Sequence, residues 1–234
     1  MKPLLLLSLG IILAAASPAT ADAELDTEEK KMLYTLGFMV SRNLVPYDLS
    51  PDELTLVHQG LADGARRQDP DLDLETFGPQ LQSFLNNRVQ EVVARQTEAG
   101  TAFREKVAAE EGNTSMESGL IYRELTPGDG ASPAATDAVL VQYRGTLIDG
   151  SVFDDSRDSP DGGPTRFQLG AVIPCFRDGI TAMKVGGKSR LTCPPELAYG
   201  PRGYPPKILG GATLTFEVEL ISIEAAAAIA PATP

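Results

Sequence analysis

The spacing of apolar residues changes once along this chain of 234 residues, close to residue 112. Before that point apolar side chains recur every three to four residues, which is typical of amphipathic helices. From Leu120 onward they alternate with polar ones, as at Val139, Val141 and Tyr143, which is typical of strands with one buried face. The change predicts an all-α N-terminal region followed by an α+β domain, in which an antiparallel sheet packs on the one short helix expected between Phe176 and Met183.

Two short helices are predicted first. One carries a broad apolar stripe over residues 32–44 and is ended by Pro46. The second begins at the capping box Ser50-Pro51-Asp52-Glu53 and runs to about Arg67. Gly60 and Gly64 stand one turn apart on its apolar face. A region of ~70 residues can hardly bury such faces alone, so we expect it to dimerise rather than to form a monomeric helical hairpin.

A third helix is predicted from about Phe77 to Glu110, roughly 50 Å long if unbroken. Beyond Ala94 its apolar residues thin to Phe103 and Val107. Its second half is therefore expected to be mostly solvated and to act as a spacer arm, with Gly100 as its weak point. This reading divides the chain into a helical dimerisation region (24–94), a connecting helix (95–112) and a C-terminal domain (113–224).

Both ends of the chain differ from the rest. Residues 1–21 have the pattern of an export signal: a basic start, an apolar run and the small-x-small site Ala19-Thr20-Ala21. The alternative, a retained membrane anchor, needs a longer apolar run. We expect an exported protein, periplasmic in a Gram-negative host or else secreted or on the outer surface, without a membrane span. Residues 225–234 form an Ala/Pro tail that is expected to fray.

Charge and composition exclude several functions. With 20 Lys+Arg against 32 Asp+Glu the net charge is −12, which argues against nucleic-acid binding. One His and two Cys are too few for a His-rich or multi-Cys metal centre. Gly187-Lys188-Ser189 looks like the end of a phosphate loop, but the glycine required before it is replaced by Ala182. We predict no cofactor and no metal.

A set of motifs in the C-terminal half resembles the FKBP-type peptidyl-prolyl cis-trans isomerases over about residues 119–224. The motifs, in order, are Val141-Gln142-Tyr143-Arg144-Gly145, Val152-Phe153-Asp154-Asp155-Ser156, Phe167-Gln168-Leu169-Gly170, Val172-Ile173-Pro174, Ala198-Tyr199-Gly200 and Thr213-Leu214-Thr215-Phe216. The exported helical region and long connecting helix further resemble the two-domain bacterial members of the macrophage infectivity potentiator type, which are homodimers.

The resemblance implies a half-barrel sheet wrapped on one short helix, with an aromatic pocket that binds proline. By resemblance the pocket is lined by Tyr143, Phe153, Val172, Ile173, Phe176, Tyr199 and Phe216. The proline ring is expected on Phe176, and the Ile173 N–H and the Tyr199 hydroxyl are expected to hold substrate carbonyls. Asp154 is expected inside the pocket, orienting Tyr143 or meeting the substrate and paired with Arg157, while Asp155 faces outward.

Two departures from the family pattern bear on the pocket. Phe176 stands where the family often has Trp, which predicts altered preference for the residue before proline and weaker binding of FK506-like macrolide inhibitors. The flap, often Ile-Pro-Pro-Asn, reads Ile208-Leu209-Gly210-Gly211. Without the diproline we expect a more mobile lid, with Tyr204 on the same loop facing the substrate.

The two cysteines, Cys175 and Cys193, leave two alternatives. An even pair in an exported protein suggests a disulfide, worth roughly 3 kcal/mol for a loop of this length. Otherwise they are two buried thiols that pack as small apolar residues.

Taken together, the sequence predicts a homodimeric prolyl isomerase that acts on proline-containing, partly folded polypeptides outside the cytoplasm. The alternative is a chaperone or adaptor that uses the same pocket to bind proline segments and barely catalyses. The altered flap keeps this alternative open, whereas Tyr143, Asp154 and Tyr199 favour catalysis.

Overall fold

The computed structural model describes residues 24–70, 72–159 and 162–224. The predicted export signal, residues 1–21, and the predicted tail, residues 225–234, lie outside the described residues. The chain divides into two compact units between Val40 and Ser41. Helix α1 (Glu28–Ser41) is the described element of the first unit, and the second unit contains the other elements. Within the described ranges, no helix has both the length and the apolar character needed to cross a membrane.

The two short helices form much as predicted. Helix α1 ends at Ser41, before a single 3₁₀ turn over Val45–Tyr47 that contains Pro46, so it stops earlier than the proline alone suggested. Helix α2 (Pro51–Ala65) begins with the predicted capping box: the Ser50 N–H donates to Glu53 Oε2 at 2.8 Å, and the Glu53 N–H donates to Ser50 Oγ at 3.3 Å. Neither helix buries a residue.

Helix α3 (Leu74–Ala109) is one unbroken segment of 36 residues, as predicted. Most residues of its second half are exposed, as expected. One face of this half nevertheless packs on the chain that leads into the last strand. Val92 and Gly100 are buried. A Cβ atom at Gly100 would overlap the Thr213 hydroxyl. The glycine therefore permits a close approach and does not break the helix.

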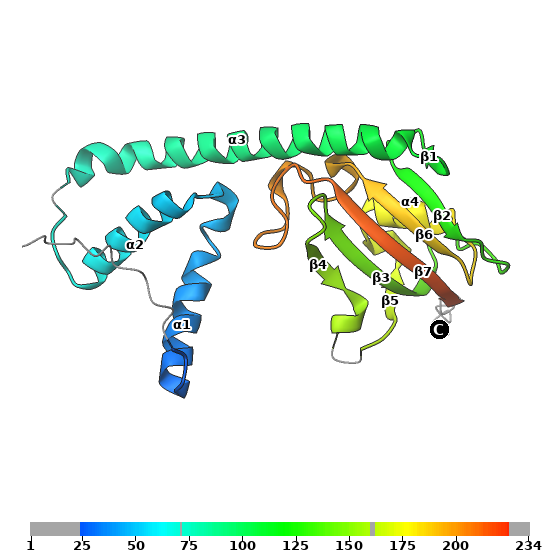
Figure 1. Ribbon diagram of the computed structural model, residues 1–234, viewed down its shortest axis with the longest axis horizontal. Coiled ribbons are helices and arrows are strands. Elements are labelled where there is room, and N and C mark those ends of the chain that lie inside the picture. The colour runs from blue at the N-terminus through cyan, green and yellow to red at the C-terminus, as the bar shows by residue number, and fades with distance from the viewer. Residues whose placement is uncertain (1–23, 71, 160–161, 225–234) are drawn as a thin grey trace, which may run out of the picture. The chain divides into compact units, whose positions relative to one another are not determined.

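Seven strands form one antiparallel sheet in the order β1-β2-β6-β7-β3-β4, with β5 pairing with β3 (Figure 1). Their bounds are β1 Asn113–Ser115, β2 Ile121–Thr126, β3 Ala138–Leu147, β4 Val152–Asp155, β5 Thr165–Gln168, β6 Lys188–Cys193 and β7 Leu214–Glu224. The long strands β3 and β7 pair from Leu147–Leu214 to Ala138–Glu224 and form the centre of the sheet. We call residues 113–224 the sheet domain and residues 24–94 the helical region.

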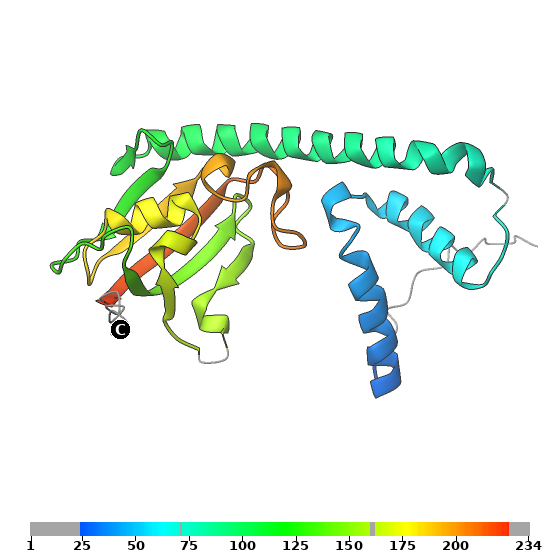
Figure 2. The same cartoon turned by 180° about the vertical axis from the view of Figure 1, so that it is seen from behind.

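Helix α4 (Pro174–Thr181) lies against one face of the sheet (Figures 1 and 2). It begins at Pro174, whose fixed φ suits the first helical position. Ile180 on its inner side packs with the sheet residues Val139, Leu191 and Val218, all fully buried. The predicted α+β fold, an antiparallel sheet wrapped on one short helix, is confirmed.

Candidate functional site

A pocket of about 410 Å³ opens between α4 and the concave face of the sheet. Its lining comes from β3, β4, β5, β7, α4 and the loops around α4 and after β6: Tyr143, Phe153, Asp154, Arg166, Phe167, Gln168, Ala171, Val172, Ile173, Phe176, Tyr199 and Phe216. All seven apolar and aromatic residues predicted by resemblance lie there, together with Asp154. The structure therefore gathers the core of the predicted site from six separate segments.

Phe176 is the centre of the aromatic lining. Its ring lies edge-to-face with Tyr143, Phe167 and Phe216 at centroid separations of 5.7, 5.4 and 5.2 Å. Phe153 packs in the same way on Phe216 at 5.5 Å. Such edge-to-face contacts hold each ring at a fixed angle. The pocket is therefore a mainly apolar hollow whose rings pack on one another around Phe176.

The polar groups of the pocket are few. The Tyr143 hydroxyl donates to Asp154 Oδ2 at 2.7 Å, and burial together with this carboxylate raises the pKa of Tyr143 well above its usual range. Burial, and next the negative charge of Asp154, raises the pKa of Tyr199. Both phenols stay protonated at neutral pH and remain donors. The Ile173 N–H has no acceptor among the described residues, since the helix begins at the next residue.

The predicted pairing of Asp154 with Arg157 is wrong. Arg157 donates from Nε to Asp155 Oδ1 at 2.9 Å and from Nη2 to Asp155 Oδ2 at 2.6 Å. This hydrogen bond lowers the pKa of Asp155 and raises that of Arg157. Neighbouring strand residues point to opposite faces, so Asp154 meets the pocket and Asp155 does not. Asp155 is nonetheless the better covered of the two, with only 8% of its side chain exposed.

Three of the predicted binding residues do not line the pocket. Arg157 is held by Asp155 outside it. Ile208 is 2% exposed and belongs to the hydrophobic core, whereas Tyr204 is 60% exposed. Tyr204 touches the pocket only through Tyr199, with ring centroids 5.5 Å apart. Both Tyr204 and Ile208 lie on residues 200–212, which we call the flap loop.

Sequence reasoning missed four lining residues, of which Phe167 matters most. Its ring contacts both Tyr143, at 5.5 Å, and Phe176. The motif Phe167-Gln168-Leu169-Gly170 was part of the resemblance, but its aromatic residue was not assigned to the pocket. The other three are Arg166, Gln168 and Ala171.

Comparison with known proteins agrees with this geometry. The family described as FKBP-type peptidyl-prolyl cis-trans isomerase matches residues 130–221, and a family described as the domain amino-terminal to it matches residues 29–123. The FKBP-type isomerase FkpA of Escherichia coli K12 is 35% identical over 227 residues, which cover 91% of this chain and 83% of FkpA. The chain belongs to the FKBP-type peptidyl-prolyl cis-trans isomerases.

Two further matches cover both parts of this isomerase. The outer membrane protein MIP of Legionella longbeachae is 32% identical over 232 residues, covering 94% of this chain and 96% of that protein. The crystal structure of E. coli FkpA matches with a TM-score of 0.63 and 33% identity over 86% of this chain and 98% of that chain. The match with FkpA thus covers both the N-terminal helical region and the sheet domain.

A disulfide lies directly behind the pocket floor of the isomerase. Cys175, next to Phe176, is bonded to Cys193 at the end of β6, with the two Cα atoms 5.7 Å apart. Both residues are fully buried. The bridge joins the start of α4 to the sheet and so fixes the helix that carries Phe176.

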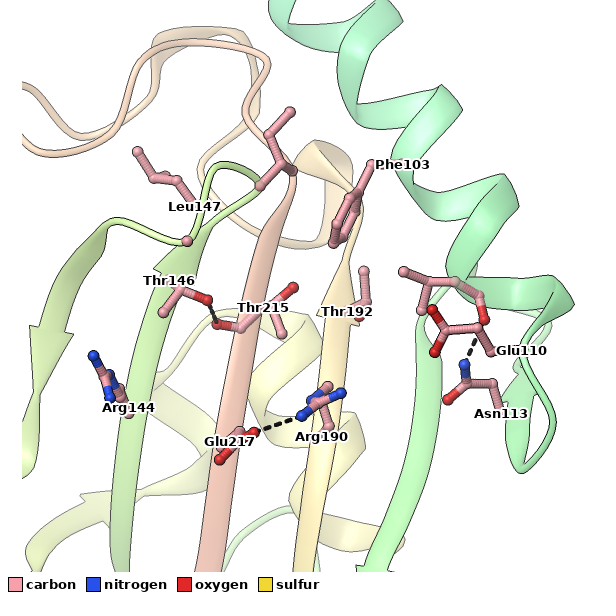
Figure 3. A pocket seen from close by; sticks show the side chains of 13 residues that line it. Phe103, Glu110, Asn113, Arg144, Thr146, Leu147, Arg190, Thr192, Thr215 and Glu217 are labelled. Carbon is pink, nitrogen blue, oxygen red and sulfur yellow. Dashed lines mark hydrogen bonds and ion pairs between the residues drawn. The ribbon is translucent and has the colours of Figure 1, made fainter.

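The isomerase has a larger pocket, of about 470 Å³, between α3 and the strands β3, β6 and β7 (Figure 3). Its walls are polar: Arg190 donates to Glu217 at 2.7 Å, and Thr146 donates to the Thr215 carbonyl at 3.4 Å. Phe103 is the one aromatic ring in its lining. Size alone would select this pocket, but only the smaller one offers an apolar, ring-lined hollow for a pyrrolidine.

Proposed function

We propose that this isomerase is an exported folding catalyst that speeds X-Pro rotation by binding the twisted amide in the aromatic pocket, with no covalent step. The observation that carries the proposal is the set of fixed rings around Phe176 with protonated phenol donors at the rim. The pocket offers binding and hydrogen bonds, which is all that rotation about a bond requires.

The energetics of the reaction favour such a pocket. Twisting the X-Pro amide breaks its resonance and crosses a barrier of about 18–20 kcal/mol, and the uncatalysed change takes on the order of 10–100 s. A 10⁴-fold acceleration needs about 5 kcal/mol of transition-state stabilisation. The twisted amide has a less polar carbonyl than the planar one, so an apolar site with few fixed donors binds it preferentially.

The residues that the resemblance assigned to the pocket and the flap loop each have a part in this proposal, Arg157 excepted. The pyrrolidine packs on Phe176 and against Phe153 and Phe216, with Val172 beside it. The Ile173 N–H and the Tyr199 hydroxyl donate to substrate carbonyls, and Asp154 keeps the Tyr143 hydroxyl oriented. Tyr204, exposed beside Tyr199, contacts residues that flank the proline, and Ile208 supports the flap loop from below.

Three observations support export. The N-terminal sequence has the pattern of a cleaved signal. A buried disulfide forms and persists mainly in oxidising compartments. A relative of matching length is named an outer membrane protein. The clients that this setting suggests are proline-containing envelope or secreted polypeptides, and FK506-like macrolides are expected to occupy the same pocket more weakly because Phe176 replaces a larger ring.

A homodimer formed through residues 24–94 is part of the proposal. The exposed apolar side chains of this region include Met32, Leu33, Leu36, Phe38, Leu56, Leu61, Phe77, Leu81 and Phe84, each at least 49% exposed. Apart from the adjacent residues and the backbone of α2 itself, no heavy atom of the described residues lies within 4 Å of a Cβ built on Gly60 or Gly64. A second copy would bury these faces, with 95–112 connecting them to the catalytic domain, 113–224. Two linked domains can hold one client at two points, which raises apparent affinity.

A protease-coupled assay on a tetrapeptide with a central X-Pro bond tests the proposal. We expect Phe153→Ala and Asp154→Ala to lower kcat/KM about 10-fold or more, equivalent to about 1.4 kcal/mol of transition-state binding. Asp129→Ala, an exposed carboxylate that does not line the pocket, is the matched control.

Two results would count against the proposal. Equal activity of all three variants would mean that the catalytic pocket lies elsewhere. A wild-type chain no faster than buffer, yet able to suppress aggregation of a proline-rich client, would favour the alternative of a proline-binding chaperone.

A further inference from the structure

Helix α3 touches the flap loop through two glycines. A Cβ built on Gly210 would lie 2.9 Å from Val93 Cγ2 and would overlap the Pro201 carbonyl oxygen. A Cβ built on Gly211 would lie 2.6 Å from the Val93 carbonyl oxygen and 2.8 Å from Thr97 Oγ1. The backbone of the loop therefore lies directly against the helix at Gly210 and Gly211, where a side chain would clash with Val93 or Thr97.

The contact continues along α3 to the end of the flap loop. The Arg104 guanidinium donates from Nη1 to Thr213 Oγ1 at 2.5 Å, and Gly100 packs on the same threonine, with its built Cβ 3.1 Å from Thr213 Cβ. In Figures 1 and 2 the base of the orange loop before β7 lies against α3, and the tip of the loop projects away from the helix. About three turns of the helix thus hold the loop and the entry into β7.

The other side of the loop is tied to the substrate pocket. The Gly211 N–H donates to the Gly200 carbonyl at 3.0 Å, and the Gly203 N–H donates to the Tyr199 carbonyl at 3.1 Å. Tyr199 is itself a pocket wall. Ile208 is buried in the core that includes Phe176. A displacement of residues 210–211 would therefore move the backbone that carries Tyr199.

We propose that Val93 and Thr97 are positioning residues for the isomerase: through Gly210 and Gly211 they fix the flap loop and thereby set how tightly the pocket holds the substrate. The inference rests on the proposed function of the pocket. It also gives the glycines a different role from the one that the sequence suggested. Leu209 and Gly210 stand where relatives often have the diproline. The contacts of Gly210 and Gly211 with α3 restrain this segment from outside.

The test uses the full-length chain and compares Val93→Ala/Thr97→Ala with Val107→Ala. Val107 lies on α3 beyond the flap loop and lines the polar pocket of Figure 3 instead. The double variant should raise KM for an X-Pro tetrapeptide about 5-fold with kcat changed less than 2-fold, the lower end of typical coupling effects. Val107→Ala should leave both constants as in the wild type. Because alanine favours helix, α3 should persist in both variants.

Amide exchange at Ile208, Leu209, Gly210 and Gly211 provides a readout that is independent of turnover. We expect exchange there to become about 10-fold faster in the double variant and unchanged in Val107→Ala, because a local contact limits local opening. Unchanged exchange and unchanged KM would overturn the inference even in an active enzyme. If exchange becomes faster in the double variant but the wild type itself shows no measurable turnover, the contact is upheld and the proposed catalytic function is refuted.

Discussion

The sheet domain and the helical region treat their apolar residues in opposite ways. In the sheet domain Val139, Leu191 and Val218 are fully buried in one continuous core. In the helical region α1 and α2 bury nothing, and Phe38 and Leu56 are 58% and 69% exposed. Burying apolar surface contributes about 25 cal/mol per Å². The sheet domain gains this energy within one chain, whereas α1 and α2 leave their apolar side chains exposed.

Helix α3 is exposed in its first half and packs against the sheet domain in its second half. Its first half exposes Phe77, Leu81 and Phe84 at 50, 54 and 56%, whereas Gly100 in its second half is buried against Thr213. The half with fewer apolar residues is thus the better packed. Close contact there is made by glycine, threonine and backbone atoms, so the number of apolar residues in a segment does not measure its burial.

The largest expected difference between the two regions is the response to truncation of a leucine. Leu191→Ala removes a fully buried side chain and should lower the free energy of unfolding of the sheet domain by about 4 kcal/mol. Leu56→Ala in α2 should change it by less than about 0.5 kcal/mol. Hydrogen exchange at the amides of β3 and β7 measures both. A similar loss in the two variants would show that the regions unfold as one unit and would break the contrast.

The disulfide should be the next strongest stabiliser of the sheet domain. Cys175→Ala/Cys193→Ala opens a loop with a sequence separation of 18 and should cost about 3 kcal/mol, measured by urea unfolding. Because both cysteines are fully buried, a reductant should break the bridge in the wild type only as the domain unfolds. Equal unfolding midpoints with and without the bridge would contradict this expectation.

Larger side chains on the helical region should weaken dimerisation, whereas the sheet domain should be destabilised by smaller ones. Gly60→Leu/Gly64→Leu keeps α2 helical but fills the faces left open for a second copy. We expect the wild type to sediment at twice the chain mass, and the variant to dissociate about 100-fold more readily, about 2.7 kcal/mol. Gly60→Ala/Gly64→Ala is the graded control and should stay near the wild type. A monomeric wild type at every concentration would refute the dimer.

The sequence predicted the fold and most of the pocket because the family motifs carry both composition and spacing. Tyr143, Phe153, Phe176 and Phe216 come from different segments, yet each lies in a motif whose place in the fold is known from the resemblance. Strand alternation also contained a signal that was not used. It places Asp154 and Asp155 on opposite faces. Arg157 reaches Asp155 because a 3₁₀ turn over Ser156–Asp158 follows the strand.

The packing of α3 was beyond prediction for a physical reason. Hydrophobic periodicity reports side chains that avoid water, but Gly100, Gly210 and Gly211 make their contacts through the absence of a side chain. A glycine that permits close approach and a glycine that permits flexibility look the same in a sequence. The partner that distinguishes them, Thr213 for Gly100, is more than a hundred residues away in the chain.

The smallest expected effect is on the stability of the sheet domain at acid pH, and it comes from the ion pair between Glu217 and Arg190. The Arg190 guanidinium, at 2.7 Å, and the nearby Lys188 hold the pKa of Glu217 below its ordinary value of 4.5. A carboxyl group with a lowered pKa stabilises the folded state above its unfolded pKa, and this contribution is lost as the pH falls through the folded pKa. Glu217→Gln should therefore flatten the loss of stability below pH 4.5. The change should stay under about 1 kcal/mol because the pair is partly exposed and screened by solvent.

Urea unfolding between pH 3 and 7 measures this change, with the exposed Glu219→Gln on the same strand as control. If both variants keep the acid response of the wild type, the pair does not contribute to the pH dependence of the sheet domain.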